Sequence, residues 1–160
     1  MSVRVAAACI ALLAFGCGPK LDAAWAAAHL RAAATSASEG GGRPAVVPVW
    51  AASEEAAWGR VVRAQTEEPL DESRALTALF DEADGAAVEA WVGGPHAPLN
   101  DQVLLDALRF TRRARVPGAH VVFVSPVPPG EDLEAMLEER GVRWSHTLWT
   151  ATPEDPAPGE

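Results

Sequence analysis

The chain has 160 residues and a net charge of −9, with 13 basic against 22 acidic side chains. This acidic balance disfavours nucleic acid as a partner and electrostatic docking on anionic lipid, because both require a basic surface. The two cysteines, Cys9 and Cys17, lie close to the N-terminus. The chain after Cys17 therefore has no thiol for a disulfide, a cysteine-based metal site or a cysteine nucleophile.

The N-terminus has the layout of a signal peptide. A weakly basic start ends at Arg4 and is followed by an apolar run from Val5 to Phe15. This run suits the core of a signal peptide and is too short to span a bilayer, which takes about 20 residues. It closes in Leu13-Ala14-Phe15-Gly16-Cys17. That segment resembles the lipobox of bacterial lipoproteins, which signal peptidase II cleaves before the cysteine.

The resemblance implies that residues 1–16 are a signal peptide and that Cys17 is the acylated first residue of the mature chain. We therefore expect an exported protein that contacts the lipid bilayer through Cys17. Gly18 stands where an Asp retains Gram-negative lipoproteins in the inner membrane, which favours the outer membrane. The alternatives are secretory cleavage after Gly16, an uncleaved anchor and a helix buried in a cytosolic protein.

Residues 17–44 are expected to form a spacer between the lipid and the folded part. Leu21 to Ala34 is rich in alanine and predicts a helix, and Ser36 to Pro44 has the composition of a flexible linker. The folded domain is then expected over residues 45–149. The proline-rich residues 150–160 are expected to be a disordered tail.

Strand-like and helix-like segments alternate between residues 45 and 149. We expect strands over residues 46–50, 86–92, 120–124 and 142–149, and helices that begin at Ser53, Asp71, Asn100 and Glu131. Pro48 indicates an edge strand or the start of a strand. The order predicts an α/β fold, a small three-layer domain of about four mostly parallel strands with helices on both faces. The alternative is an α+β domain whose last strand runs antiparallel at one edge.

Ligands bind beyond the carboxyl ends of the strands in open parallel sheets. At this edge, the candidate ligand-binding residues are Gly93, Gly94, His96, Asn100 and Ser125. The loop lacks the spacing of a phosphate-binding glycine loop, and Ser125 lacks the G-x-S-x-G context of a hydrolase nucleophile. We assign no catalytic residue, no cofactor and no metal. The four histidines are widely spaced and form no H-x-x-x-H pair.

Tryptophan is unusually frequent, with six residues against no tyrosine. Trp50, Trp58 and Trp91 are expected to face the core. Trp144 and Trp149 fall in the last expected strand, where an edge position would offer an aromatic patch to a partner.

Three functions follow from these patterns, in decreasing order of support. The first is a membrane-anchored envelope lipoprotein whose domain is a non-catalytic module that binds another envelope protein or has a structural role. The second is a small-ligand-binding domain or a hydrolase that uses the strand ends near His96 and Ser125. The third is a lipoprotein toxin delivered between cells.

Overall fold

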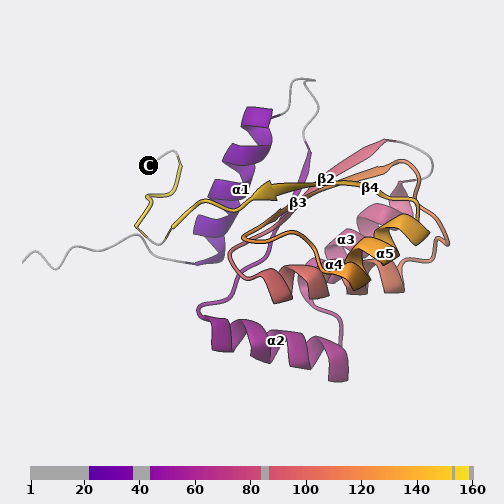
Figure 1. Ribbon diagram of the computed structural model, residues 1–160, viewed down its shortest axis with the longest axis horizontal. Helices are drawn as coiled ribbons and strands as arrows, with labels where there is room; N and C mark the ends of the chain where they lie inside the picture. Colours follow the sequence, from indigo (N-terminus) through magenta and orange to yellow (C-terminus); the bar gives the residue numbers. More distant parts are fainter. Residues whose placement is uncertain (1–21, 38–43, 84–86, 153, 159–160) are drawn as a thin grey trace, which may run out of the picture.

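The computed structural model describes residues 22–37, 44–83, 87–152 and 154–158 (Figure 1). The expected signal peptide, Cys17 and residues 38–43 of the expected linker lie outside the described residues. The elements are α1 (Ala23–Ala37), β1 (Ala45–Pro48), α2 (Glu54–Thr66), α3 (Asp71–Glu82), β2 (Val88–Gly93), α4 (Ala97–Phe110), β3 (Ala119–Ser125), α5 (Glu131–Glu139) and β4 (Arg143–Leu148).

The strands form one four-stranded sheet in the order β1-β2-β3-β4, and every neighbouring pair is parallel. The expected α/β class is therefore confirmed. The antiparallel alternative for the last strand is wrong, because β4 pairs in parallel with β3 at the edge of the sheet. β1 is the other edge strand, and Pro48 ends it at a position where a missing N–H is tolerated.

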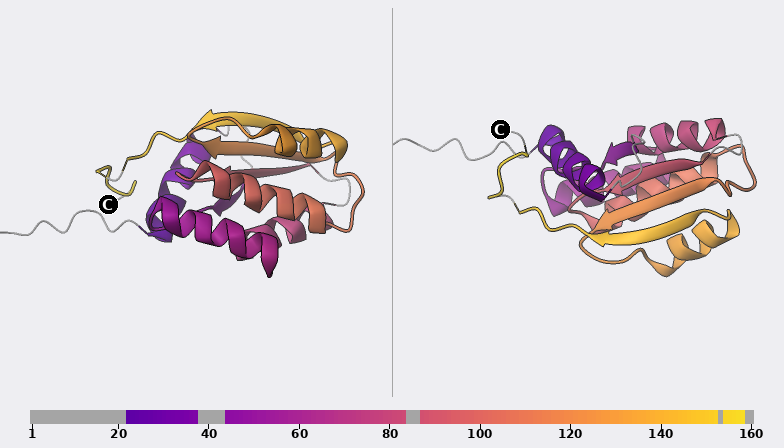
Figure 2. Two further views of the ribbon diagram at one scale, coloured as in Figure 1. Left: turned by 60° about the horizontal axis from the view of Figure 1, so that its bottom comes forward. Right: turned by 90° about the horizontal axis from the view of Figure 1, so that it is seen from above.

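The sequential strand order determines where the connecting helices lie. Each crossover advances by one strand in the same direction, so right-handed connections place all of their helices on one face of the sheet. Figures 1 and 2 show α2, α3, α4 and α5 together on that face and α1 alone on the other. The helices of the first face bury the larger core against β2 and β3, with Leu76, Phe80, Leu104, Leu108, Leu133 and Leu137 at its centre.

The helix α1 is the third layer of the domain, and its interpretation as a spacer is wrong. Trp25, Leu30 and Ala34 are buried and pack with Trp91 and Val122 of the sheet. The physical reason is that this sheet face is apolar around Trp91 and requires a cover, and the small alanines of α1 let the helix approach closely. The folded part therefore includes α1 rather than beginning at residue 45.

The expected disordered tail also packs against the domain where it is described. Ala151 and Ala157 pack against the smaller core that α1 closes, which includes the buried Trp149 just before the tail. The indole Nε1 of Trp25 donates a hydrogen bond to the Asp155 carbonyl at 2.9 Å. The tail covers an indole edge that would otherwise lack a partner, which explains why its proline content does not keep it apart.

Two of the expected helix starts are displaced. Ser53 caps α2 as expected, and its Oγ accepts the Ala56 N–H at 3.1 Å. Leu70 and His96, rather than Asp71 and Asn100, are the N-cap residues of α3 and α4. Pro98 stands in the first turn of α4, a position that suits proline, so the helix begins before Asn100.

Candidate functional site

The glycines at the end of β2 serve the sheet. Gly94 N donates to Val124 O at 3.0 Å, and Gly93 O accepts from Val49 N at 2.8 Å, so the ladder continues on both sides. A Cβ on Gly93 would lie 1.8 Å from Val124 O, and a Cβ on Gly94 would lie 1.9 Å from Val49 O. Gly93 also has a φ of +153°, which side chains rarely adopt. The close approach made by these glycines is to neighbouring strands.

Asn100, in the first turn of α4, binds the backbone just after β2. Its side chain is fully buried, and its Nδ2 donates to Gly94 O at 2.8 Å. Its Oδ1 is buried without a hydrogen-bond partner among the described residues. Asn100 therefore ties α4 to the end of β2.

Ser125 lies in the interior at the end of β3. The residue is fully buried, and its Oγ has no hydrogen-bond partner within the described part of the chain. Its carbonyl accepts from Trp149 N and from His146 Nε2, both at 3.0 Å. The following residue, Pro126, lines the nearby pocket, whereas Ser125 does not. The structure thus places His96 at a pocket and Ser125 in the core.

The pocket beside His96 lies between α2 and the loops that follow β2 and β3. It has a volume of about 230 Å³ and is lined by Glu54, Ala57, Trp58, Pro95, His96, Ala97, Pro98 and Pro126. His96 Nε2 donates to Ala51 O at 3.0 Å, so the Nδ1 of the neutral ring is an acceptor. Trp58 is 57% exposed, and its expected place in the core is wrong. The lining combines apolar side chains with Glu54 and His96, which suits a small ligand that has both apolar and polar groups.

A second polar cluster lies on the same face of the sheet as α1, since its residues alternate along the strands with Trp91 and Val122, which pack on that side. Figure 2 shows that α1 covers only part of this face. Glu89, His120 and Ser145 come from β2, β3 and β4 and form a chain across the strands. His120 Nδ1 is 3.5 Å from Glu89 Oε2, and His120 Nε2 is 3.3 Å from Ser145 Oγ. Trp91 Nε1 fixes the carboxylate by donating to Glu89 Oε1 at 2.8 Å.

The order carboxylate, imidazole, hydroxyl is the one that activates a serine for nucleophilic attack. Glu89 and His120 are partners in the register of β2 and β3, and Arg143 is opposite His120 on β4. Arg143 thus places a cation on the strand that carries the hydroxyl. This cluster is not evident from the sequence, because the three residues are far apart in the chain and only the strand register brings them together. The signal available in the sequence was the alternation along each expected strand, which assigns each of the three residues to one face of its strand.

Two carboxyl groups of α4 are partly or fully buried. Asp101 Oδ2 accepts the Gly130 N–H at 3.1 Å at the start of α5, and burial raises the pKa of Asp101. Asp106 Oδ1 accepts from Gln102 Nε2 at 2.8 Å, and burial likewise raises the pKa of Asp106. Asp101 thus ties α4 to the start of α5, whereas Asp106 bonds within α4, and neither residue lines the pocket beside His96.

Aromatic rings gather just beyond the carboxyl ends of the strands. The ring centroid of Trp25, at the start of α1, is 5.6 Å from that of Trp50 and 5.9 Å from that of Trp149. His29 is 4.6 Å from Trp25, and His96 is 6.2 Å from Trp50. The cluster joins the first helix, the tail and the end of β1.

Among the residues that the structure describes, no group of three or more His, Cys, Asp or Glu side chains is arranged to hold a metal ion. In the same ranges, no helix has both the length and the apolar character to cross a membrane. Comparisons with protein-family models, with curated proteins and with solved structures found no match.

Proposed function

We propose that this chain is an exported lipoprotein that carries its lipid on Cys17 and holds its α/β domain at a membrane surface as a non-catalytic interaction module. The observation that carries the proposal is the uncharged run from Val5 to Phe15, which ends in Gly16-Cys17. Each buried CH₂ of an acyl chain contributes about 0.8 kcal/mol, so a multiply acylated cysteine anchors a protein durably.

The position of α1 supports a close attachment. Cys17 is five residues from Asp22, the first described residue, which directly precedes α1. Five residues span at most about 18 Å, at up to about 3.6 Å per residue. A lipid on Cys17 would therefore hold the domain next to the bilayer and in reach of other envelope proteins.

The open half of the sheet supports an interaction role. α1 contacts mainly β1 and β2, so the face of β4 that carries Arg143, Ser145 and Thr147 is exposed. A parallel sheet is usually covered on both faces. A partner with polar side chains would complete this cover, and we propose an envelope protein in that role.

Lipidation is tested by palmitate labelling of the expressed full-length chain. Cys17→Ala removes the acceptor thiol, so it should abolish the label and leave the precursor unprocessed. Globomycin inhibits the cleavage step alone, so it should leave a precursor that is uncleaved but still labelled. Cys9→Ala is the matched control, because Cys9 lies inside the signal core and is removed with it, so its label should equal that of the wild type. Undiminished processing of Cys17→Ala would contradict the proposal.

The proposed location is the outer membrane. Separating the two membranes on a density gradient should place the wild type in the outer-membrane fraction. Gly18→Asp should move it to the inner membrane, since that position selects lipoproteins for retention. A wild type that stays with the inner membrane would contradict this location.

Hydrolysis is a second candidate, which the Glu89–His120–Ser145 chain favours. A serine activated in this way reacts with a fluorophosphonate probe through its Oγ, with fluoride as the leaving group. Labelling should be lost in Ser145→Ala and kept in Ser125→Ala, whose hydroxyl is buried. A wild type that the probe does not label would exclude this second candidate.

A further inference from the structure

Large apolar side chains are exposed at the end of the domain where the strands finish. Trp58 is 57% exposed, Val127 is 51% exposed and Leu148 is 57% exposed. They come from the second turn of α2, the loop after β3 and the last position of β4. We call these three residues the carboxyl-end rim. Residues from three separate elements thus place exposed apolar surface at one end of the molecule.

The chain enters the fold at the same end. The first turn of α1 contains Trp25, whose ring packs against Trp50 and Trp149, and both of these residues follow the ends of strands. Figure 1 shows the start of α1 beside the carboxyl ends of β1 to β4, with the tail next to it. A lipid on Cys17 therefore attaches to the domain at the rim, over a leash of at most about 18 Å.

We infer that the carboxyl-end rim rests in the interface of the bilayer that holds the Cys17 lipid, where it contacts zwitterionic headgroups of zero net charge. The inference rests on the proposed lipidation. Tryptophan favours the interface of a membrane because its ring is apolar and its N–H is polar. The short leash makes the contact intramolecular in effect, so three apolar side chains suffice where they would not hold a free protein.

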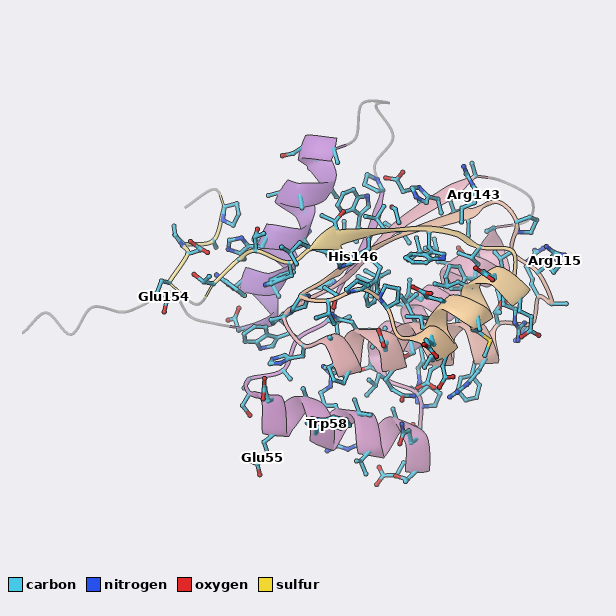
Figure 3. The ribbon with its side chains drawn as sticks, viewed as in Figure 1. Glu55, Trp58, Arg115, Arg143, His146 and Glu154 are labelled. Atoms are coloured by element: carbon cyan, nitrogen blue, oxygen red, sulfur yellow. The ribbon has the colours of Figure 1, made fainter. Side chains whose placement is uncertain are left out.

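The charges of the domain select this kind of lipid. Glu54 and Glu55 open α2 at the rim end, and Glu131 and Asp132 open α5 there, all of them exposed. These carboxylates oppose contact with anionic lipid. Figure 3 shows Glu55 and Trp58 on α2, with Arg115 at the opposite end of the molecule. An anionic surface would therefore repel the rim end, whereas the anchor turns the rim toward the bilayer.

The test uses site-directed spin labels on the full, lipidated chain in phosphatidylcholine vesicles. The mature chain has no cysteine other than Cys17, whose thiol the lipid occupies, so a new cysteine is labelled alone. Val127→Cys and Leu148→Cys report on the rim, and Arg115→Cys is the matched control at the exposed far end. Labels 127 and 148 should collide several-fold more with oxygen, relative to a nickel chelate, than label 115 does.

The outcomes distinguish failure of the rim contact from failure of the lipoprotein proposal. Equal, water-like accessibility at all three sites, with mass spectrometry confirming the lipid on Cys17, would overturn the rim contact and leave the lipoprotein proposal standing. An unmodified Cys17 would overturn both. Protection of the rim only after a protein is added would assign the rim to that protein and overturn the bilayer contact.

A second measurement needs no label and guards against a misfolded cysteine variant. Brominated lipid should quench part of the tryptophan fluorescence of the lipidated chain. Trp58→Phe should remove most of the quenched part, because the other rings near the rim are largely covered. Identical quenching of the wild type and Trp58→Phe would contradict the rim contact.

Discussion

At the scale of single residues, the groups that look most like a ligand site hold the sheet together. Gly93 and Gly94 let β2 meet both neighbouring strands, and Asn100 binds the carbonyl of Gly94 from α4. Ser125 is inside the core. A glycine pair followed by His and Asn therefore signals close packing of backbone here, and the pocket is made instead by Trp58, His96 and prolines.

The glycine at 93 is expected to be intolerant of any side chain. Gly93→Ala places a Cβ against the backbone of Val124 and should lower the free energy of unfolding by about 2–3 kcal/mol. Gly59→Ala is the control, because a Cβ there meets nothing within 4 Å inside α2, and it should stabilise by about 0.5–1 kcal/mol. Urea unfolding of both variants measures the difference. A Gly93→Ala variant as stable as the wild type would contradict the packing at this position.

Asp106 is expected to make stability depend on pH. Burial raises its pKa above the ordinary 3.8, so the folded state holds the proton more tightly than the unfolded state. The carboxyl therefore lowers the free energy of unfolding as pH rises through the window between the two pKa values. Asp106→Asn should be more stable than the wild type at pH 7, and this advantage should shrink toward pH 3.

Asp81 is the control for that experiment, because its pKa is shifted in the opposite direction. The hydroxyl of Thr111 donates to it at 2.6 Å and lowers its pKa, so its contribution is present at neutral pH and is lost in acid. Asp81→Asn should be less stable than the wild type at pH 7. If both variants changed the free energy of unfolding at pH 7 in the same direction, burial would not be what sets the pKa of Asp106.

At the scale of elements, the strands and helices between residues 45 and 149 could be predicted from apolar patterns and turn residues. The run around Val121 to Val124 is a central strand, and the alternation of elements gave the parallel sheet. The role of α1 could not be predicted, because alanine distinguishes a buried face from an exposed face poorly. The exposure of Trp58 could not be predicted for a related reason: helical spacing shows which residues share a face of the helix, but it does not show whether that face packs against the domain.

The third layer is expected to be essential for stability. Leu30 is fully buried between α1 and the sheet, so Leu30→Ala should cost about 2–5 kcal/mol in thermal or chemical unfolding. Val62→Ala, at an exposed site on α2, should change stability by no more than about 0.5 kcal/mol. Equal stability of the two variants would show that α1 does not stabilise the domain and would support the interpretation of α1 as a spacer.

At the scale of the whole molecule, the leash and the fold together determine how the domain meets the membrane. Because α1 packs on the sheet, only the few residues from Cys17 to Asp22 separate the proposed lipid from the folded part, in place of the expected spacer of residues 17–44. The same packing places that connection at the end of the sheet that carries the carboxyl-end rim. The hydrogen-bonded chain on the open sheet face lies away from it, where a partner can reach it.

Lengthening the leash is expected to release the rim while keeping the protein on the membrane. About 20 Gly and Ser residues inserted after Lys20 lower the effective concentration of the rim at the bilayer. The label at Val127→Cys should then become more accessible to the nickel chelate, although the protein still floats with the vesicles. A label that stays as protected as before would show that the leash length does not matter.

The most direct test of the account is the mass of the amino-terminal peptide from membrane-bound protein. The expected product begins at Cys17 and carries a diacylglyceryl group, with or without an amide-linked acyl chain. An intact Met1, or a water-soluble product that begins with a free cysteine, would contradict it.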